Sequence, residues 1–425
     1  MDNKAIRMKN FNSLLLVIFS VIYIIVLGYL DYITGPYITF SFFYIIPMVV
    51  FAWFLPRELI LIPLVLTILS RYNAVVRSPY KYMHPIFPIW NAFWEVAAFI
   101  LIIYILVTLK EKLGVIATLK NKELLEVNAQ ETVRRIEEHI RELVNEHKPS
   151  KVLIGLSGGI DSAVLTTLAV RALGKDKVVV YHLYDDNCQK KYLEKARLMA
   201  DWLGLQLHIQ YFDLKTAKKR IRSSFFEWLN KLPPSLDRFF LRIYSLIFGE
   251  TLFVTTMRRE EFRKNWLRRL AYRYLVAEIE IMFDGWFRKM RDFLEEIAKK
   301  ENMLILGAGN YTEASVGWFT KGGIDDMPYS PIEKLYKTQV NQIAKYLGIP
   351  ARIRYQMPSA GVLSGASDEV ALGMSYDKID IILYGIEQGL DGREIADYGV
   401  TKREIKKGYE MNRLAIRKKN SPYQK

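Results

Sequence analysis

Cysteine is almost missing from this chain: Cys188 is the single one among 425 residues. A lone thiol cannot form an internal disulfide bond. The sequence therefore excludes a fold held by disulfides and predicts a reducing compartment for the bulk of the chain. Cys188 follows Asp185-Asp186-Asn187 in an expected loop, without the His and Asn partners of a cysteine nucleophile, so we interpret it as an incidental thiol.

Acidic residues are scarce relative to basic ones. The chain has 60 Lys and Arg against 45 Asp and Glu, which gives a formal net charge of +15. An excess of this sign indicates anionic partners, namely a lipid surface, a nucleic acid or phosphate-rich substrates.

Charge is also sparse in the first hundred residues, where apolar runs reach the length that crosses a bilayer. These runs cover 11–30, 37–55 and 90–109, with a weaker one at 59–76 that contains Arg71. Basic residues flank the set at both ends, so both ends are predicted to face the cytoplasm, which requires an even number of crossings. The flanking residues are Lys4, Arg7 and Lys9 before the runs and Lys110 and Lys112 after them.

We predict four spans in a transmembrane bundle at 1–110, which makes the protein an integral protein of the cytoplasmic membrane with its remaining part in the cytoplasm. Within the bundle Arg71 and Glu95 are ionisable; they either pair, line a ligand cavity or reach an interface. The segments 30–36 and 40–47 and the pair Trp90-Asn91 resemble the multi-span input region found ahead of some bacterial signalling domains.

A charged stretch at 111–149 contains apolar residues at helical spacing and predicts a helical linker, acting as a spacer or as a stiff coupling. The periodic positions include Leu125, Val133, Ile136, Ile140 and Leu143, and Pro149 ends the pattern.

The apolar strand 151–156 then enters the turn Ser157-Gly158-Gly159-Ile160-Asp161-Ser162. Gly158 and Gly159 leave backbone N–H groups open to an anion, and the helix that follows adds its partial positive charge. Ser157 and Ser162 supply hydroxyl groups, and Asp161 supplies a carboxylate suited to Mg²⁺. The kinase-type loop Gly-x-x-x-x-Gly-Lys-Ser/Thr is absent, so the turn favours cleavage of ATP between its α and β phosphates.

Expected strands at 178–183 and 207–212 alternate with helices at 163–173 and 192–203. This order predicts a doubly wound α/β domain with a parallel sheet, whose site lies at the carboxyl edge of the strands. The domain is expected to cover 150–425, in addition to the α-helical membrane bundle.

The turn at 157–162 resembles the loop of the N-type ATP pyrophosphatases, an adenine nucleotide alpha hydrolase-like fold. Further segments resemble ammonia-dependent NAD synthetases in order and spacing, over about 127–212 and 302–422. They are Gly307-Ala-Gly-Asn310-Tyr-Thr-Glu313, Gly317-Trp-Phe-Thr320-Lys321, Pro331 to Lys337, Pro358-Ser359-Ala360, Asp368-Glu369 and Leu372 to Tyr376.

The resemblance implies a two-step reaction. A substrate carboxylate attacks the α-phosphorus of ATP and releases pyrophosphate, and ammonia then displaces AMP from the acyl-adenylate. It assigns Asp161 and Glu313 to Mg²⁺, Asp161 and Lys337 to catalysis, and Lys337 and Ser359, with the turn itself, to ATP. Lys321 matches a contact to the dinucleotide. A homodimer is also expected.

The sequence departs from the family pattern around the acceptor. After Lys321 it reads Gly-Gly-Ile-Asp325-Asp326, and either carboxylate is a candidate for acceptor binding; near the C-terminus Arg417-Lys418-Lys419 replaces a His-Lys-Arg triplet, and Lys418 is the matching contact. Between 215 and 300 the pattern gives way to a basic, aromatic insert. We interpret this insert as a helical region that packs on its own core or contacts lipid. Because a tethered chain already has a bilayer to contact, the basic and aromatic residues do not require a nucleic-acid partner.

Three functions stay open. The first is a membrane-tethered NAD synthetase that amidates deamido-NAD with free ammonia, since the chain has no glutaminase-sized region. The second is an adenylating ligase for another carboxylate, including a lipid-linked one. The third is a membrane sensor that binds a nucleotide without turnover.

Overall fold

The computed structural model describes residues 3–34, 40–54, 61–77, 93–94, 96–109, 124–184, 190–212, 234–258, 266, 269, 272, 277–355 and 367–421. The chain forms two compact units. One comprises Met1–Ala117 together with Arg238–Thr251, and the other comprises Thr118–Asp237 together with Leu252–Lys425.

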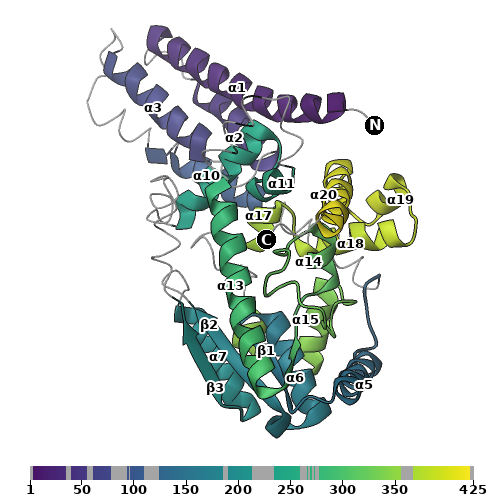
Figure 1. Cartoon of the computed structure of the whole chain (residues 1–425). Coiled ribbons are helices and arrows are strands. Elements are labelled where there is room, and N and C mark those ends of the chain that lie inside the picture. Colours follow the sequence, from purple (N-terminus) through teal and green to yellow (C-terminus); the bar gives the residue numbers. More distant parts are fainter. Residues whose placement is uncertain are drawn as a thin grey trace. The chain divides into compact units, whose positions relative to one another are not determined.

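Four parallel strands form the sheet of the second unit, in the order β3-β2-β1-β4 (Figure 1). The strands are β1 (Lys151–Gly155), β2 (Val178–Tyr184), β3 (Leu207–Tyr211) and β4 (Met303–Leu306). Val152, Leu153 and Ile154 of β1 are all buried, the pattern of a parallel strand that is covered on both faces. The predicted parallel α/β sheet is confirmed.

The strand order creates a switch point. From β1 the chain moves outward to β2 and β3, and it then returns to the other side of β1 to form β4. Ligands of open α/β sheets bind in the crevice at such a point, beyond the carboxyl ends of the strands. Here the switch point lies between β1 and β4.

Helices cover both faces of the sheet. Val152 and Ile154 pack with α5 (Ala129–His147), α6 (Ile160–Leu173), α7 (Lys190–Leu203) and α15 (Lys337–Tyr346), while Leu153 points the other way onto α13 (Ala277–Glu301). Two short helices, η3 (Lys175–Lys177) and α16 (Ala351–Arg354), lie in connections.

Helix α5 falls in the stretch assigned to a linker, but its apolar side belongs to the core of the second unit. Val133, Ile136, Ile140 and Leu143 are buried there with β1 and α6. Complete burial of a side chain such as Ile140 contributes about 1.5–3 kcal/mol. Removing α5 would therefore expose the sheet-covering layer and not merely shorten a spacer.

A second apolar cluster holds the C-terminal helices together. It is built from α11 (Leu252–Met257), α14 (Tyr311–Val316), α17 (Asp368–Leu372), α18 (Tyr376–Glu387), α19 (Gly392–Asp397) and α20 (Lys402–Asn420). Glycine is needed where α20 packs on α18, because a Cβ on Gly408 of α20 would lie 2.6 Å from the Ile382 side chain of α18.

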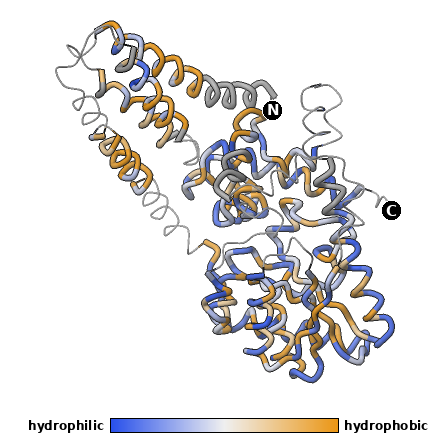
Figure 2. Tube along the Cα trace, turned by 90° about the vertical axis from the view of Figure 1, so that its left-hand side faces the viewer, coloured by the Kyte–Doolittle hydropathy of each residue, from blue (hydrophilic) through white to orange (hydrophobic). Residues whose placement is uncertain are grey.

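The first unit is apolar and helical. Its helices are α1 (Asn3–Thr34), η1 (Ser41–Tyr44), α2 (Ile45–Phe54), α3 (Leu61–Arg77) and, from the insert, α10 (Pro234–Phe248). Helices α1 to α3 are dominated by hydrophobic residues (Figure 2). Ile243 and Leu246 of α10 pack against Phe51 and Ala52 of α2.

Within the described residues, one helical stretch, Leu16–Thr34, is long and apolar enough to cross a membrane. Phe42–Ala52 and Val96–Leu109 are shorter apolar helices, and α3 has 17 residues. The four crossings predicted from the sequence are thus not supported.

Arg71 forms an ion pair with Asp31. Its Nη1 donates to Oδ2 of Asp31 at 2.8 Å, and the same carboxylate accepts hydrogen bonds from the Tyr44 hydroxyl and the Phe40 amide at 3.1 Å each. Glu95 lies outside the described residues. The ion pair joins α1 to α3, a buried role that the apolar pattern alone did not reveal.

Candidate functional site

The predicted phosphate loop joins the end of β1 to the start of α6. Gly158 has φ +83°, and a Cβ at this position would lie 2.4 Å from the Tyr192 carbonyl oxygen of α7. The glycine is therefore required both for the left-handed backbone and for the close approach of α7. Gly159 precedes the first residue of α6, Ile160, so the loop ends at the positive end of a helix.

The two serines of the loop bind each other. Their hydroxyl groups are 2.9 Å apart, and Ser162 Oγ also accepts from the Ser157 amide at 3.2 Å. The Gly159 amide donates to Ser157 Oγ at 3.2 Å. A phosphate group entering the loop would exchange these internal bonds for bonds to its own oxygens, so the donors are already converged on one point.

A histidine that the sequence did not single out holds the start of this loop. His182 on β2 is buried, and its Nδ1 donates to the Leu156 carbonyl at 2.8 Å. Burial lowers the pKa of His182 and keeps the ring neutral. Because the Leu156 amide donates in turn to the Tyr181 carbonyl at 2.8 Å, β2 fixes the end of β1 from two sides.

Lys337 forms the centre of the site. Its ammonium group lies 2.5 Å from Oδ2 of Asp161 and 2.8 Å from Oε1 of Glu313, and the side chain is 2% exposed. Asp161 lies in the first turn of α6, Glu313 in the first turn of α14, and Lys337 is the first residue of α15. Three helix N-termini thus meet through these side chains, and three predicted site residues are in direct contact.

The charges of this cluster are strongly coupled. Burial opposes the charge of Lys337, but Asp161 and Glu313 more than offset it and raise the pKa of the lysine above its ordinary value. Burial also raises the pKa of Glu313 to about 7, against the attraction of Lys337. At neutral pH the lysine is a fixed cation, whereas Glu313 is poised between its two protonation states.

Asn310 links the two carboxylates. Its Nδ2 donates to Asp161 Oδ1 at 2.9 Å, and its Oδ1 accepts from the Glu313 amide at 3.0 Å as the N-cap of α14. The side chain has no exposed surface. The sequence placed Asn310 in a matched segment without a role; an Asn directly before a helix is the signal that predicts a cap.

Asp380 positions the backbone of Lys337 and was also missed. This buried carboxylate on α18 accepts from the Thr312 hydroxyl at 2.5 Å and from the Thr338 amide at 2.8 Å. Thr312 Oγ in turn accepts from the Lys337 amide at 2.8 Å. Burial raises the pKa of Asp380 to about 7.

Tyr376 closes the cluster from α18. Its ring lies beneath the Lys337 ammonium, 5.2 Å from nitrogen to ring centroid, and its hydroxyl donates to Asp368 at 3.1 Å. Burial raises the pKa of this phenol, so it stays a proton donor. Tyr376 and Asp368 both came from segments matched in the sequence, but no role was assigned to them.

The predicted acceptor residues lie on the loop 320–326 and at the end of α20. Side chains of this loop reach the sheet edge: a Cβ on Gly155 would be 3.3 Å from Ile324 Cδ1. Asp325 accepts from the Thr320 amide at 3.0 Å and Asp326 from the Gly322 amide at 2.8 Å. Burial raises the pKa of Asp325 to about 7. Both carboxylates therefore shape the loop.

Lys321 and Lys418 form a reciprocal clamp. Lys321 Nζ donates to the carbonyls of Lys418, Lys419 and Ser421, the Lys419 bond being 2.6 Å, and so caps the C-terminal end of α20. Lys418 Nζ donates to the carbonyls of Gly317, at 3.1 Å, and Phe319. Backbone carbonyl oxygens thus accept hydrogen bonds from both ammonium groups.

The donor set suits magnesium in a nucleotide complex. Mg²⁺ is usually held by one or two carboxylates together with substrate phosphates and water. Asp161 and Glu313 match this pattern, and no group of three metal-binding side chains occurs among the residues that the structure describes. With Lys337 they carry a net charge of −1 when both are ionised. An ATP polyanion would need a further cation here. Ser359 lies outside the described residues.

Comparison with known proteins adds to this geometry. The family model for NAD synthase matches residues 132–231 and 287–422, more than half of the chain. The chain belongs to the NAD synthase family. Family members are ATP-dependent carbon–nitrogen ligases, and so is this chain. Residues 232–286 fall outside the match, a shorter stretch than the insert assigned at 215–300, and α10 and α11 lie within it.

Curated NAD synthases are similar over most of their length. The NH₃-dependent NAD⁺ synthetase of Methanocaldococcus jannaschii is 34% identical over 266 residues, which cover 63% of this chain and 85% of that protein. The Pyrococcus horikoshii protein of the same name is 32% identical, over 68% and 93%. A solved NH₃-dependent NAD synthetase from Campylobacter jejuni superposes with a TM-score of 0.46 at 20% identity, over 70% of this chain and 100% of that structure.

Proposed function

We propose that this chain is an NAD synthetase that converts deamido-NAD to NAD with ATP and free ammonia. The observation that carries the proposal is the contact of Lys337 with Asp161 and Glu313 at the switch point of the sheet, beside the loop 157–162. The NH₃-dependent relatives named above support ammonia as the nitrogen donor.

The reaction brings two anions together. The substrate carboxylate attacks the α-phosphorus of ATP, the bond to the β-phosphate oxygen breaks, and pyrophosphate leaves. We propose that the loop amides and the Ser157 and Ser162 hydroxyls bind the leaving pyrophosphate, and that Lys337 stabilises the negative charge that develops on the phosphates. A magnesium ion bound by Asp161 and Glu313 would supply further charge neutralisation.

The second step needs a nucleophile without charge. Ammonia attacks the acyl carbon of the adenylate, loses a proton, and AMP leaves. The loop 320–326 adjoins the sheet edge through Ile324, and we propose that it excludes water from the reactive acyl group. Asp325 and Asp326 act there by fixing the loop, in addition to any direct contact with the acceptor.

Purified full-length protein in nanodiscs, given ATP, Mg²⁺, ammonia and deamido-NAD, tests the proposal. We expect pyrophosphate, AMP and NAD in equal amounts. Asp161→Asn should lower turnover at least about 100-fold by removing a carboxylate that would hold the magnesium ion. Asp176→Asn, at an exposed aspartate of η3, is the matched control and should leave turnover unchanged. Absence of NAD and pyrophosphate with the unaltered protein would overturn the proposal.

A second candidate function is adenylation of another carboxylate. It is favoured by the clamp, because Lys321 and Lys418, the cations expected to meet deamido-NAD, are bound to backbone carbonyls. Pyrophosphate release that deamido-NAD does not stimulate, but that a lipid-linked or other carboxylate does, would favour this function over NAD synthesis.

We also propose that the ligase is tethered to the cytoplasmic membrane and acts as a homodimer. The candidate span Leu16–Thr34 supports the tether. Retention in the membrane fraction after carbonate extraction tests the tether, and recovery in the soluble fraction would refute it. Mass photometry of the protein in nanodiscs tests the dimer, for which a single-copy mass is the contrary result.

A further inference from the structure

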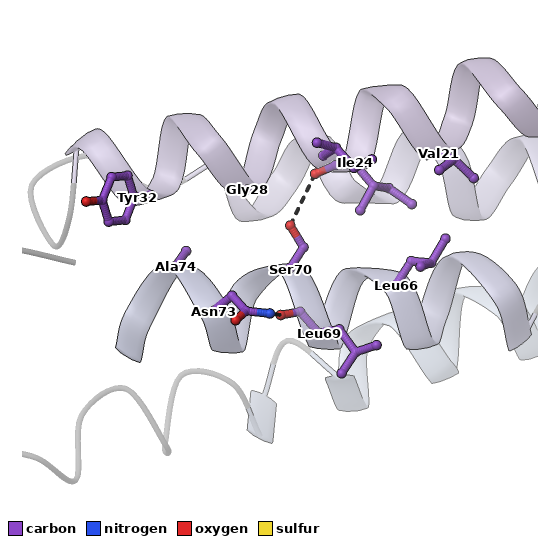
Figure 3. A pocket seen from close by; sticks show the side chains of 10 residues that line it. Val21, Ile24, Gly28, Tyr32, Leu66, Leu69, Ser70, Asn73 and Ala74 are labelled. Atoms are coloured by element: carbon purple, nitrogen blue, oxygen red, sulfur yellow. Dashed lines mark hydrogen bonds between the residues drawn. The ribbon is translucent and has the colours of Figure 1, made fainter. Parts of the chain in front are cut away.

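A pocket lies between α1 and α3 in the first unit (Figure 3), and none of its described lining residues belongs to the ligase site. Its volume is about 480 Å³, within the range of roughly 300–1,000 Å³ that small-molecule sites occupy. None of the ten described residues that line it is charged.

Close packing at one point forms the floor of the pocket. A Cβ on Gly28 of α1 would lie 1.9 Å from Ser70 Oγ of α3, so only glycine permits this approach. The Ser70 hydroxyl is satisfied by the Ile24 carbonyl at 3.3 Å. The two helices therefore touch at Gly28 and leave space beside this contact.

The lining changes character along the pocket. Val21 and Leu66 lie at one end, and Tyr32 and Asn73 lie toward the other (Figure 3). Asn73 uses its Nδ2 to donate to the Leu69 carbonyl at 2.9 Å, so its oxygen is the atom suited to accept a bond from a ligand. The Tyr32 hydroxyl can donate or accept. A ligand with an apolar tail and a hydroxyl head matches both ends.

The surroundings of the pocket are apolar as well. Ile22 and Val26 of α1 are 54% and 50% exposed, a surface that suits contact with lipid better than with water. Among the described residues that line the pocket, none carries a charge that would neutralise an anion, which disfavours an ionised fatty acid or a phospholipid headgroup.

We propose that this pocket binds a single-chain amphiphile with an uncharged, hydroxyl-bearing head, taken from the bilayer. The tail lies along Val21 and Leu66, and the head meets Tyr32 and Asn73. This site is separate from the ligase chemistry and does not depend on which carboxylate the enzyme amidates.

Photo-crosslinking tests the site in full-length protein reconstituted in phosphatidylcholine nanodiscs, with hexadecanol carrying a diazirine in mid-chain as the probe. We expect labelled peptides from 21–25 and 66–69. Leu69→Trp fills the pocket from α3 and should reduce labelling at least tenfold. Ile68→Trp is its control, since this neighbouring side chain is exposed but does not line the pocket.

A second pair of variants, on α1, keeps the test valid if the α3 variants fail to fold. Ile25→Trp fills the pocket from α1, and Val26→Trp places the same ring outside it. Unlabelled hexadecanol should compete at least tenfold better than hexadecane or palmitate, and Asn73→Leu should remove its advantage over hexadecane. Equal competition by hexadecane, or labelling spread over α1 and unchanged in both filling variants, would overturn the proposal and indicate ordinary boundary lipid.

Discussion

Replacing Lys337 with methionine removes the buried cation between Asp161 and Glu313 while keeping an apolar side chain of similar length. Deleting one partner of a buried ion pair costs about 3–5 kcal/mol, because the remaining charge is uncompensated. The two carboxylate side chains are each 18% exposed, so water compensates part of the loss. We expect local stability to fall by about 3 kcal/mol at pH 8.

The loss should depend on pH with a sign set by Glu313. The pKa of Glu313 is raised to about 7 in the folded protein. The stability of the wild type therefore falls as the pH rises from the ordinary glutamate pKa toward 7, and it stops falling above pH 7 because Glu313 is then ionised in both states. Without Lys337 this pKa rises further, so the variant continues to lose stability where the wild type no longer does. The difference grows by up to about 1.4 kcal/mol per pH unit above 7.

Hydrogen exchange of the Thr338 amide measures this effect in the full chain, since that N–H follows Lys337 and donates to Asp380. A loss of about 3 kcal/mol corresponds to exchange roughly 140-fold faster, after correction for the intrinsic rate. Lys334→Met, at an exposed lysine in the preceding turn, should change exchange by less than about twofold. Unchanged protection at pH 8, or an effect that shrinks as pH rises, would refute the reasoning.

Three further substitutions probe the supports of the site. Gly158→Ala should abolish pyrophosphate release, because it adds a clash to the strain of a positive φ. Gly174 also has a positive φ, with ψ 153°, and open space around it, so Gly174→Ala should show only backbone strain, about 1–3 kcal/mol in a melting curve. Asp380→Asn should flatten the decline in melting temperature between about pH 4 and pH 7, since the buried carboxyl group of Asp380 costs stability as it ionises through its pKa of about 7. Lys321→Met should speed amide exchange at the end of α20 about tenfold, and Lys418→Met should have the same effect at 317–320. Each substitution removes a charged donor that contributes about 1.5 kcal/mol. Unchanged exchange in both variants would show that the clamp is not formed in solution.

The sequence predicted the parts of the site that are local. The apolar run of β1, the glycine turn and the α/β alternation are encoded within about thirty neighbouring residues, and the structure has them where they were expected. The resemblance also gave Asp161, Glu313 and Lys337 their candidate roles. It did not predict that the lysine contacts both carboxylates, because those contacts join helices far apart in the chain.

The supports of the site escaped prediction for the same reason. Asp380 and Thr312 are separated by 68 positions, and each is an ordinary polar residue until the fold buries the two together. The apolar stripe of α5 was visible, but a stripe does not say what covers it, so its helix was assigned to a linker. The ion pair of Arg71 with Asp31 was missed because Asp31 stood in a segment interpreted only by its resemblance to a membrane input region.

The place of α10 bears on how a water-soluble form of the ligase could be made. Ile243 and Leu246 pack on Phe51 and Ala52, so deleting the N-terminal region alone would expose these apolar side chains of α10 to water and favour aggregation. Excising 234–251 in the same step removes the residues that would become exposed, and the whole of that stretch lies outside the family match.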